Sequence, residues 1–375
     1  MTAAQDRSMA TAHQGWLGLY QRGIGGQPLA GAALPQLMAR GTLLAEFVLE
    51  RGQHGPLPLV HLATHTGWPR LLSLALAGDG RLMLRQRQGE AHAAVSLAAA
   101  DFLGSGGRFR LTYRWNAPGR HSLLTLESLD GGTIRQAVGA NPLPMPQADL
   151  AALLAGRGAA VHGDALRWLA LSEGTVPVGP GAAFAPSTPV ETPSGPRPAM
   201  QIRAGDFVQT ADAGAQEVLW SGRVALPALG SLAPIRLGAG RFGRTRDIWV
   251  LPHTRIAMTG STVEYMFGTD CVLVEARHLL DSVSASQIER PSMLAWHGIL
   301  LRGHHLLVAD GQQIESLYTG ALAAAPMLAA TTALADIAAM GKLPTHHRPA
   351  IRELRPYEAT ALAAARARFH APVAA

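Results

Sequence analysis

The chain of 375 residues contains a single cysteine and a single lysine, and few of its residues are aromatic or charged. Cys271 has no second cysteine to pair with, which excludes an intrachain disulfide and a zinc site built from several cysteines. The net charge of +6 comes from arginines scattered along the chain, with Lys342 as the one lysine. Because aromatic residues make up only 5% and no basic run contains them, we do not expect nucleic-acid binding.

Long apolar runs are also missing. The run 321–335 is mostly alanine and contains Pro326, so it is too short and too weakly apolar to cross a bilayer. The first 20 residues lack an apolar core behind a basic start and do not form a Sec signal peptide. With 48% hydrophobic and 15% charged residues, we expect a soluble globular protein, cytoplasmic or exported without a leader, and no cofactor.

Glycine and proline are plentiful, with 41 and 25 residues, and they separate short alternating runs in the N-terminal half. The first segment, 1–40, is polar, with a short helix expected at 34–40. The runs after it predict eight strands and a ninth that returns to the sheet. The eight are 42–50, 59–65, 71–77, 82–86, 93–97, 108–115, 123–129 and 133–138, and the ninth is 165–172. A short helix is expected at 147–156. This spacing is typical of an antiparallel sandwich or jelly roll.

The segment 41–175 resembles a concanavalin-type, LamG-like sandwich in its pattern, without a signature motif. Such sandwiches often bind sugars, so a carbohydrate-binding module is one alternative function, although the fold alone does not fix it. A sugar platform needs exposed aromatic residues, but Trp68, Trp115 and Trp168 stand among apolar residues, and we interpret them as core. His61 and His65 have the spacing of a helical metal pair, yet they lie in a predicted strand, which argues against a metal site.

A Gly/Pro-rich segment without periodicity, 173–182, predicts a domain boundary, with the linker placed at 176–182. We therefore expect five parts: an N-terminal segment, a sandwich, a linker, a second all-β domain and a helical extension. Their ranges are 1–40, 41–175, 176–182, 183–320 and 321–375. In the extension, a helix at 321–340 should break near Pro326, and another should cover 357–369.

The second domain opens with β-prone runs at 188–192 and 207–210, separated by Pro and Gly turns. Strands are expected at 217–223, ending in a glycine turn, and through 263–280. The motif residues are Phe184, Pro186, Thr188, Thr192, Gly195, Gly205, Asp206, Val208, 234–237, 247–250, His304, 308–311 and 315–316. In order and spacing these residues resemble a hedgehog/intein (Hint) autoprocessing domain of the bacterial type. The resemblance covers about 183–320.

The resemblance implies an acyl shift. In that family a Cys or Ser at the first position attacks the preceding carbonyl, and a histidine protonates the departing amide nitrogen. Here the first position is Ala183, and Thr254 occupies the place of the histidine, with His253 one residue away. Asp206 and His304 match the family pattern. A later Tyr-x-His motif is replaced by 296–298, again with its histidine out of frame.

Several residues could compensate. Ser187 could act as a displaced nucleophile, although its place favours a turn residue, and His253 could assist only if the segment bulges. Cys271 lies in an apolar strand and is expected to behave as a small hydrophobe. His304 and His305 lack a carboxylate or cysteine at ligand spacing, so no metal site is expected.

The preferred hypothesis is a Hint domain without autoprocessing activity, retained as a structural or binding scaffold. Two alternatives stay open: self-cleavage through an atypical nucleophile such as Ser187, and carbohydrate binding by the sandwich. A partner would then be a carbohydrate or another protein. Whether the chain is an enzyme is undecided; if it is active, the reaction is a self-cleaving acyl shift at a peptide bond.

Overall fold

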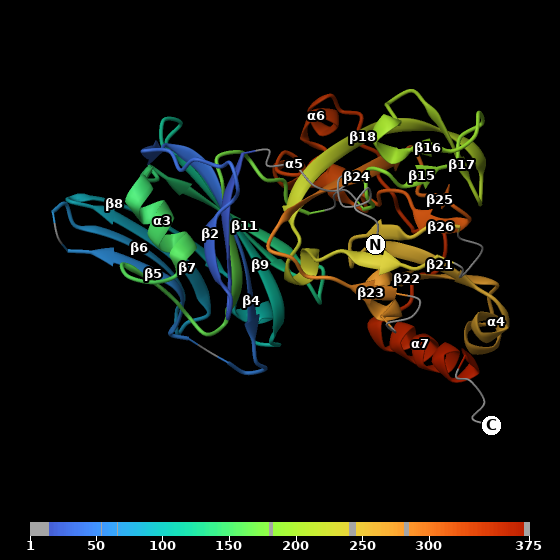
Figure 1. Cartoon of the computed structure of the whole chain (residues 1–375), viewed down its shortest axis with the longest axis horizontal. Coiled ribbons are helices and arrows are strands. Elements are labelled where there is room, and N and C mark those ends of the chain that lie inside the picture. Colours follow the sequence, from blue (N-terminus) through green and yellow to red (C-terminus); the bar gives the residue numbers. More distant parts are fainter. Residues whose placement is uncertain are drawn as a thin grey trace. The chain divides into compact units, whose positions relative to one another are not determined.

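The computed structural model describes residues 15–53, 55–65, 67–179, 183–239, 245–280 and 285–370. The chain divides into two compact units, with the division after Gly179 (Figure 1). Both units are built mainly from antiparallel strands, as the sequence predicted. Within the described ranges, no helix combines the length and apolarity that crossing a membrane requires.

The N-terminal unit is a sandwich of a seven-stranded and a five-stranded sheet, with a two-stranded ribbon beside them. The larger sheet has the order β11(Ile134–Ala140), β10(His121–Ser128), β9(Gly107–Asn116), β4(Arg40–Leu49), β14(Leu166–Ser172), β1(Trp16–Gln21), β2(Gly25–Pro28). The smaller has the order β13(Ala160–His162), β5(Leu57–Thr64), β6(Arg70–Leu76), β7(Arg81–Gln88), β8(Ala91–Ala98). The ribbon pairs β3(Leu37–Met38) with β12(Met145–Pro146). Two helices, α2(Ala100–Leu103) and α3(Gln147–Ala155), complete the unit.

The apolar positions of both sheets form one buried core, because alternate residues of each strand point to the same face. The strands predicted from residue 42 onward are all present, and the helix at 147–156 is confirmed as α3. The helix expected at 34–40 is wrong, because this segment forms β3 and the start of β4. The sandwich also extends beyond the expected range, since β1 and β2 belong to its larger sheet.

Two further expectations about this unit need correction. Trp115 and Trp168 are buried as expected, but Trp68, in the β5–β6 connection, is 64% exposed. The expected linker begins as an ordered segment, since Val176 and Val178 are buried. Val176 also receives a hydrogen bond on its carbonyl oxygen from the guanidinium of Arg114. Residues 176–179 are therefore held against the sandwich, and residues 180–182 lie outside the described ranges.

The C-terminal unit contains a second seven-stranded sheet, a three-stranded sheet and a small ribbon. The large sheet has the order β22(Cys271–Glu275), β21(Arg255–Thr259), β26(Gln312–Glu315), β25(Leu306–Ala309), β17(Phe207–Thr210), β18(Gly214–Pro227), β24(Met293–Leu301). The three-stranded sheet has the order β20(Ile248–Val250), β19(Ile235–Leu237), β23(Ala285–Gln287). The ribbon pairs β15(Pro189–Val190) with β16(Arg197–Pro198). Short 3-10 turns lie at Ala199–Gln201, Gly230–Leu232 and Ala276–Leu279.

Two local predictions in this unit are wrong. The strand expected across 263–280 begins instead as a helix, α4(Ser261–Phe267), which ends at Gly268 in a left-handed conformation before β22 starts. The strand expected to stop at a glycine turn continues through Gly222, which pairs with Gly298 of β24 in a long ladder. A Cβ on Gly222 would meet the ring of Trp220 at 2.1 Å, so close packing requires this glycine.

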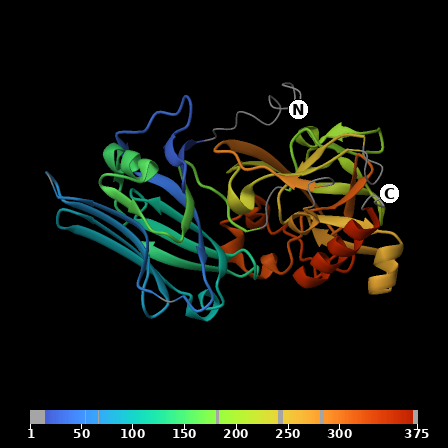
Figure 2. The same cartoon turned by 60° about the horizontal axis from the view of Figure 1, so that its bottom comes forward.

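The helical extension packs on the second unit, with α7 in its main core and α5 and α6 in a separate apolar cluster around Leu300 and Leu317. It comprises the turn Leu322–Ala324 and the helices α5(Pro326–Ala329), α6(Ala335–Ala339) and α7(Pro356–His370). The residues before α7 run beside β22, with a parallel bridge between Leu273 and Glu353. Leu354, Ala359 and Leu362 are buried in the core of the unit, and α7 packs on α4 (Figures 1 and 2).

Candidate functional site

The backbone of Ala183 is held between two segments that come from later parts of the chain. The N–H groups of Ala183 and Phe184 both donate to the carbonyl of His297, at 3.0 and 3.2 Å. The N–H of His297 donates in return to the carbonyl of Phe184 at 2.8 Å, and that of Leu251 donates to the carbonyl of Ala183. These bonds involve only the main chain, so they fix the position of Ala183 whatever its side chain is.

Thr254, which stands at the histidine place of the motif, lies next to Ala183. Its side-chain hydroxyl donates a hydrogen bond of 2.9 Å to the Ala183 carbonyl, and the residue is completely buried. A tight turn from Leu251 to Thr254 closes with a backbone hydrogen bond of 3.0 Å. His253 lies in this turn and is exposed. The threonine hydroxyl is therefore a side-chain group that contacts Ala183 directly.

His297 makes a side-chain contact that the sequence did not reveal. Its Nε2 lies 2.8 Å from the hydroxyl of Ser221, which is on the neighbouring strand β18. The imidazole is buried, and its Nδ1 has no hydrogen-bond partner among the described residues. Burial lowers the pKa of His297 to about 4, and the charges of Arg203 and Arg223 act in the same direction. The ring is therefore neutral near pH 7.

Asp206 and His304 match the family motif but lie in other surroundings. Asp206 Oδ2 accepts hydrogen bonds from the backbone N–H of Arg203 at 2.8 Å and from the guanidinium of Arg197 at 3.2 Å. These contacts close the turn before β17. Neither Asp206 nor His304 hydrogen-bonds to Ala183 or Thr254 within the described part of the chain. Of the four motif positions, the structure therefore brings Ala183 and Thr254 together and places Asp206 and His304 elsewhere.

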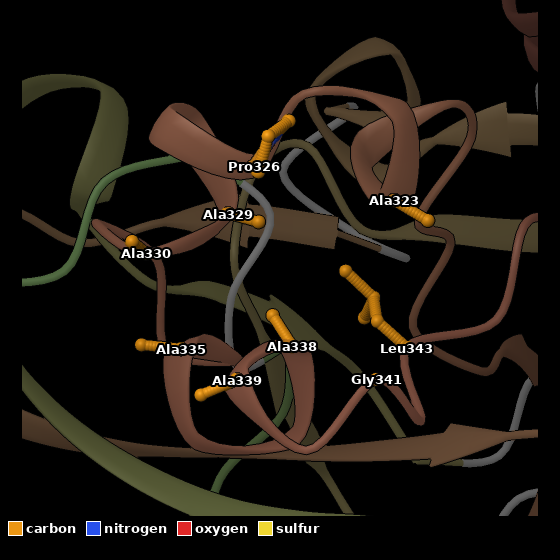
Figure 3. Close-up of a pocket in the computed structure, with 9 residues that line it drawn as sticks. All are labelled: Ala323, Pro326, Ala329, Ala330, Ala335, Ala338, Ala339, Gly341 and Leu343. Atoms are coloured by element: carbon orange, nitrogen blue, oxygen red, sulfur yellow. The ribbon is translucent and has the colours of Figure 1, made fainter.

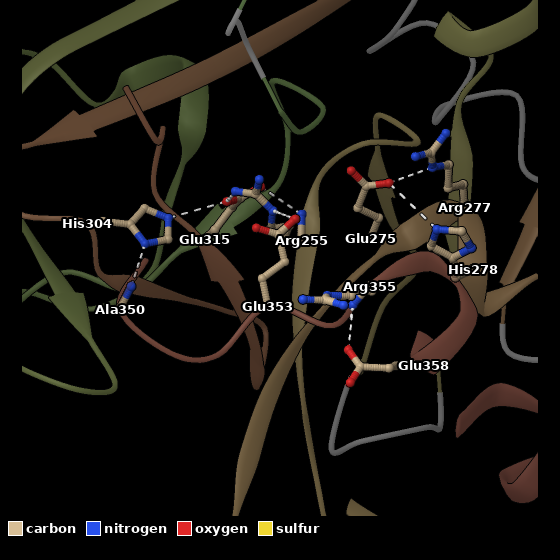
Figure 4. Close-up of polar contacts among 10 residues, drawn as sticks. All are labelled: Arg255, Glu275, Arg277, His278, His304, Glu315, Ala350, Glu353, Arg355 and Glu358. Carbon is tan, nitrogen blue, oxygen red and sulfur yellow. Dashed lines mark hydrogen bonds and ion pairs between the residues drawn. The ribbon is translucent and has the colours of Figure 1, made fainter. Parts of the chain in front are cut away.

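His304 belongs instead to a buried charged cluster (Figure 4). Glu315 accepts from the guanidinium of Arg255 at 2.9 Å and from its backbone N–H at 2.8 Å, and its Oε2 lies 3.3 Å from His304 Nε2. The N–H of Ala350 donates to His304 Nδ1 at 2.8 Å, so Nε2 carries the proton and donates to Glu315. Arg255 also pairs with Glu353 at 2.9 Å. The cluster thus joins β21, β26 and the loop before β25 to the C-terminal extension.

The charges of this cluster stabilise one another. Burial alone would raise the pKa of Glu315, but the hydrogen bond from His304 and the charge of Arg255 reverse the effect and leave the pKa below its usual value. Burial likewise acts to lower the pKa of Arg255, and the carboxylates of Glu315 and Glu353 outweigh it. Both groups therefore stay charged in the interior, as an ion pair.

Among known protein families, the profile of the Hint domain matches residues 182–321. The chain contains a Hint domain. No curated protein matches the chain.

Among solved structures, the MchDnaB-1 intein has 14% sequence identity and a TM-score of 0.26, and the match covers 36% of this chain and 99% of the intein. Domains LG4-5 of the mouse laminin alpha1 chain have 9% identity and a TM-score of 0.21, over 81% of this chain and 75% of theirs. The CBM2 module of Lactobacillus casei BL23 phage J-1 evolved Dit has 9% identity and a TM-score of 0.20. That match covers 36% of this chain and 61% of the module. Such TM-scores give no information about what this chain binds.

The other candidate residues of the Hint domain are placed away from Ala183. Ser187 is exposed in the turn that joins Ala185 to Thr188, closed by a backbone bond of 3.0 Å. Cys271 is buried in β22, and burial, followed by the charge of Asp270, raises the pKa of its thiol. His305 pairs with Asp212 at 2.9 Å. No group of three metal-ligating side chains is present among the described residues.

A cavity of about 260 Å³ lies in the helical extension after the part of the chain that the Hint profile matches (Figure 3). Its walls are small apolar side chains from the turn before α5, from α5 and α6, and from the loop after α6. The lining residues are Ala323, Pro326, Ala329, Ala330, Ala335, Ala338, Ala339, Gly341 and Leu343. This lining offers no acid, base or nucleophile, so the cavity supplies no chemistry to the Hint domain.

Proposed function

We propose that the Hint domain of this chain does not perform the autoprocessing acyl shift and serves as a structural or binding scaffold. The observation that carries the proposal is the contact between Ala183 and Thr254. The first position has a methyl group where the reaction needs a thiol or hydroxyl, and the residue that faces it is a threonine. Two necessary groups are thus replaced at one place.

The geometry also argues against simple replacements. A threonine hydroxyl has no accessible pKa near neutrality, so Thr254 cannot serve as the general acid that a leaving amide nitrogen requires. His253 is exposed on the turn, and the group that hydrogen-bonds to the Ala183 carbonyl is the hydroxyl of Thr254. Ser187 is exposed four residues downstream, and the turn that contains it accounts for its presence.

The test is a cleavage assay on the purified full-length chain. The protein is incubated with hydroxylamine, which cleaves an ester or a thioester, or with dithiothreitol, which cleaves a thioester, and intact mass is followed by mass spectrometry. We expect the full mass of 39.4 kDa to persist. A fragment that begins at Ala183 would refute the proposal. If any cleavage occurs, Ser187→Ala tests the alternative nucleophile, with Ser286→Ala as a matched serine control.

A second candidate function, carbohydrate binding by the sandwich, is favoured by one observation. The indole of Trp68 is 64% exposed at the β5–β6 connection, and its five-membered ring lies against Gly89, where an added Cβ would be 2.3 Å from Nε1. The ring is therefore supported by a turn while open to solvent. Nearby, Arg70 and Asp149 form an ion pair at 2.9 Å and could offer polar contacts to a sugar.

A glycan array tests this candidate. The protein must include β1 and β2, since a fragment that starts at residue 41 lacks two strands of the larger sheet. We expect binding that is lost in Trp68→Ala and retained in a variant at another exposed apolar residue, Val138→Ala. An array without signals for the intact chain, or signals unchanged by Trp68→Ala, contradicts the candidate.

A further inference from the structure

Ser221 and His297 form a serine–histidine pair that is separate from the position of the missing nucleophile. Ser221 pairs with Ile299 and Arg223 pairs with His297 across the β18–β24 ladder, so the two side chains are diagonal neighbours on one face of the sheet. Phe184 pairs with His297 on its other side and shares this face. Ala183 itself hydrogen-bonds to the backbone carbonyl of His297, whereas the imidazole faces Ser221.

The state of the pair suits nucleophilic chemistry. The Ser221 hydroxyl lies 2.8 Å from His297 Nε2, within the range over which a base accepts the proton of a serine. Ser221 is half-buried, so a ligand can reach it, whereas His297 is 5% exposed. Two neighbouring strands fix both residues. Because the two side chains already lie in contact, no entropy has to be lost in bringing them together when a substrate binds.

A second observation concerns the other nitrogen of the ring. When Nε2 accepts the serine proton, Nδ1 carries hydrogen, and this buried atom has no partner among the described residues. Buried polar atoms in proteins are nearly always hydrogen-bonded, to protein, water or ligand. The unpartnered nitrogen is therefore a hydrogen-bonding group that water or a bound molecule would have to satisfy.

We propose that Ser221 and His297 act as nucleophile and general base toward small carboxylic esters that carry a negative charge. The Ser221 oxygen bonds to the acyl carbon while its proton moves to His297 Nε2. The alcohol then leaves with that proton, which gives an acyl-serine and a neutral imidazole. Water attacks the acyl-serine with the same nitrogen as base, releases the acid and restores Ser221. No oxidant, metal or further reactant is needed.

The preference for an anionic ester comes from two arginines. Arg203 precedes β17 and Arg223 lies in β18, both are exposed, and both are near enough for their charges to act on His297. They would attract an anionic substrate and favour the negative charge that develops on the carbonyl oxygen. At the surface such an effect is modest and screened by salt, roughly two- to fivefold in kcat/KM.

The experiment uses the full-length chain and a fluorophosphonate probe, which forms a covalent adduct with an activated serine and is located by peptide mass spectrometry. We expect an adduct on Ser221 of the native protein, abolished by unfolding in guanidinium and reduced at least about 100-fold in His297→Gln. Ser286→Ala, at another half-buried strand serine, is the control and should leave the adduct on Ser221 unchanged. Hydrolysis of 4-nitrophenyl acetate and mono-4-nitrophenyl succinate then tests the charge preference, which Arg223→Gln should reduce.

The pH profile separates this pair from an ordinary serine. Because His297 has a pKa of about 4, labelling should be flat from about pH 5 to 8 and fall below about pH 4, where the imidazole becomes protonated. A rate that rises tenfold per pH unit through this range, or no adduct on Ser221 of the native protein, would overturn the proposal whether or not the variants fold. This test is independent of the cleavage assay, because acylation of Ser221 does not break the chain. Failure of one proposal therefore does not imply failure of the other.

Discussion

Acid should lower the free energy of unfolding of the Hint domain, because His297 is held neutral in the fold. The pKa of this imidazole is about 4 in the folded protein and 6.5 in an unfolded chain. Between these values the unfolded state binds a proton that the folded state does not, so stability falls as the pH drops from about 6.5 to 4. The gap corresponds to about 3 kcal/mol below both values and to about 2 kcal/mol at pH 5. With 5% exposure, solvent screening reduces it little.

The assay is guanidinium unfolding at pH 7.5 and pH 5, followed by hydrogen exchange and mass spectrometry so that peptides of each unit are read separately. His297→Gln keeps a donor or acceptor for Ser221 but does not titrate, so we expect it to remove about 2 kcal/mol of the pH dependence in peptides of β18 and β24. His162, whose pKa burial also lowers to about 4, lies in the sandwich and supplies the control. His162→Gln should leave the Hint peptides unchanged. An equal pH dependence in wild type and His297→Gln would refute the reasoning.

Four other experiments have definite expected results. Glu315→Gln removes the buried anion that faces Arg255 and should lower the free energy of unfolding by about 3–5 kcal/mol, measured by denaturant titration. Leu354→Ala, in the extension, should cost about 2–5 kcal/mol in the same measurement; no loss would show that the extension is not part of the core. Cys271 should react with a thiol reagent only at the rate of unfolding, and rapid reaction of the native protein would contradict its burial. Ala183→Cys alone should fold and stay intact in dithiothreitol, because Thr254 cannot supply the proton; cleavage seen by mass spectrometry would show otherwise.

The strands of the sandwich were predictable because their signals are local. In β6 and β7, apolar residues alternate and the turn between them contains glycine, so period and turn agree. The helix predicted at 34–40 was wrong because the apolar residues of this segment pair with a distant strand, as Met38 does with Met145. A local helical pattern gives no information about such pairing. At 261–267 the sequence composition favoured a strand, whereas the left-handed Gly268 ends a short helix.

The site was partly predictable for a similar reason. A family motif records which residues meet, so the approach of Thr254 to Ala183 followed from their places in the pattern. No motif contained Ser221 and His297, which are 76 residues apart and meet only through the register of β18 with β24. A shift of one residue in that register would turn one of the two side chains to the other face of the sheet. Such contacts become visible only in the folded chain.

The same hydrogen bonds explain how the Hint domain keeps its frame with an alanine at position 183. Ala183 is fixed by main-chain groups of His297 and Leu251, so the identity of its side chain adds nothing to these contacts. The stability of the domain resides instead in its strands and in the cluster of Arg255 and Glu315, which also holds the extension through Glu353. The position that would react and the contacts that hold the fold are therefore separate. Substitutions at the reacting position can remove the chemistry while leaving the surfaces of the domain available to other partners.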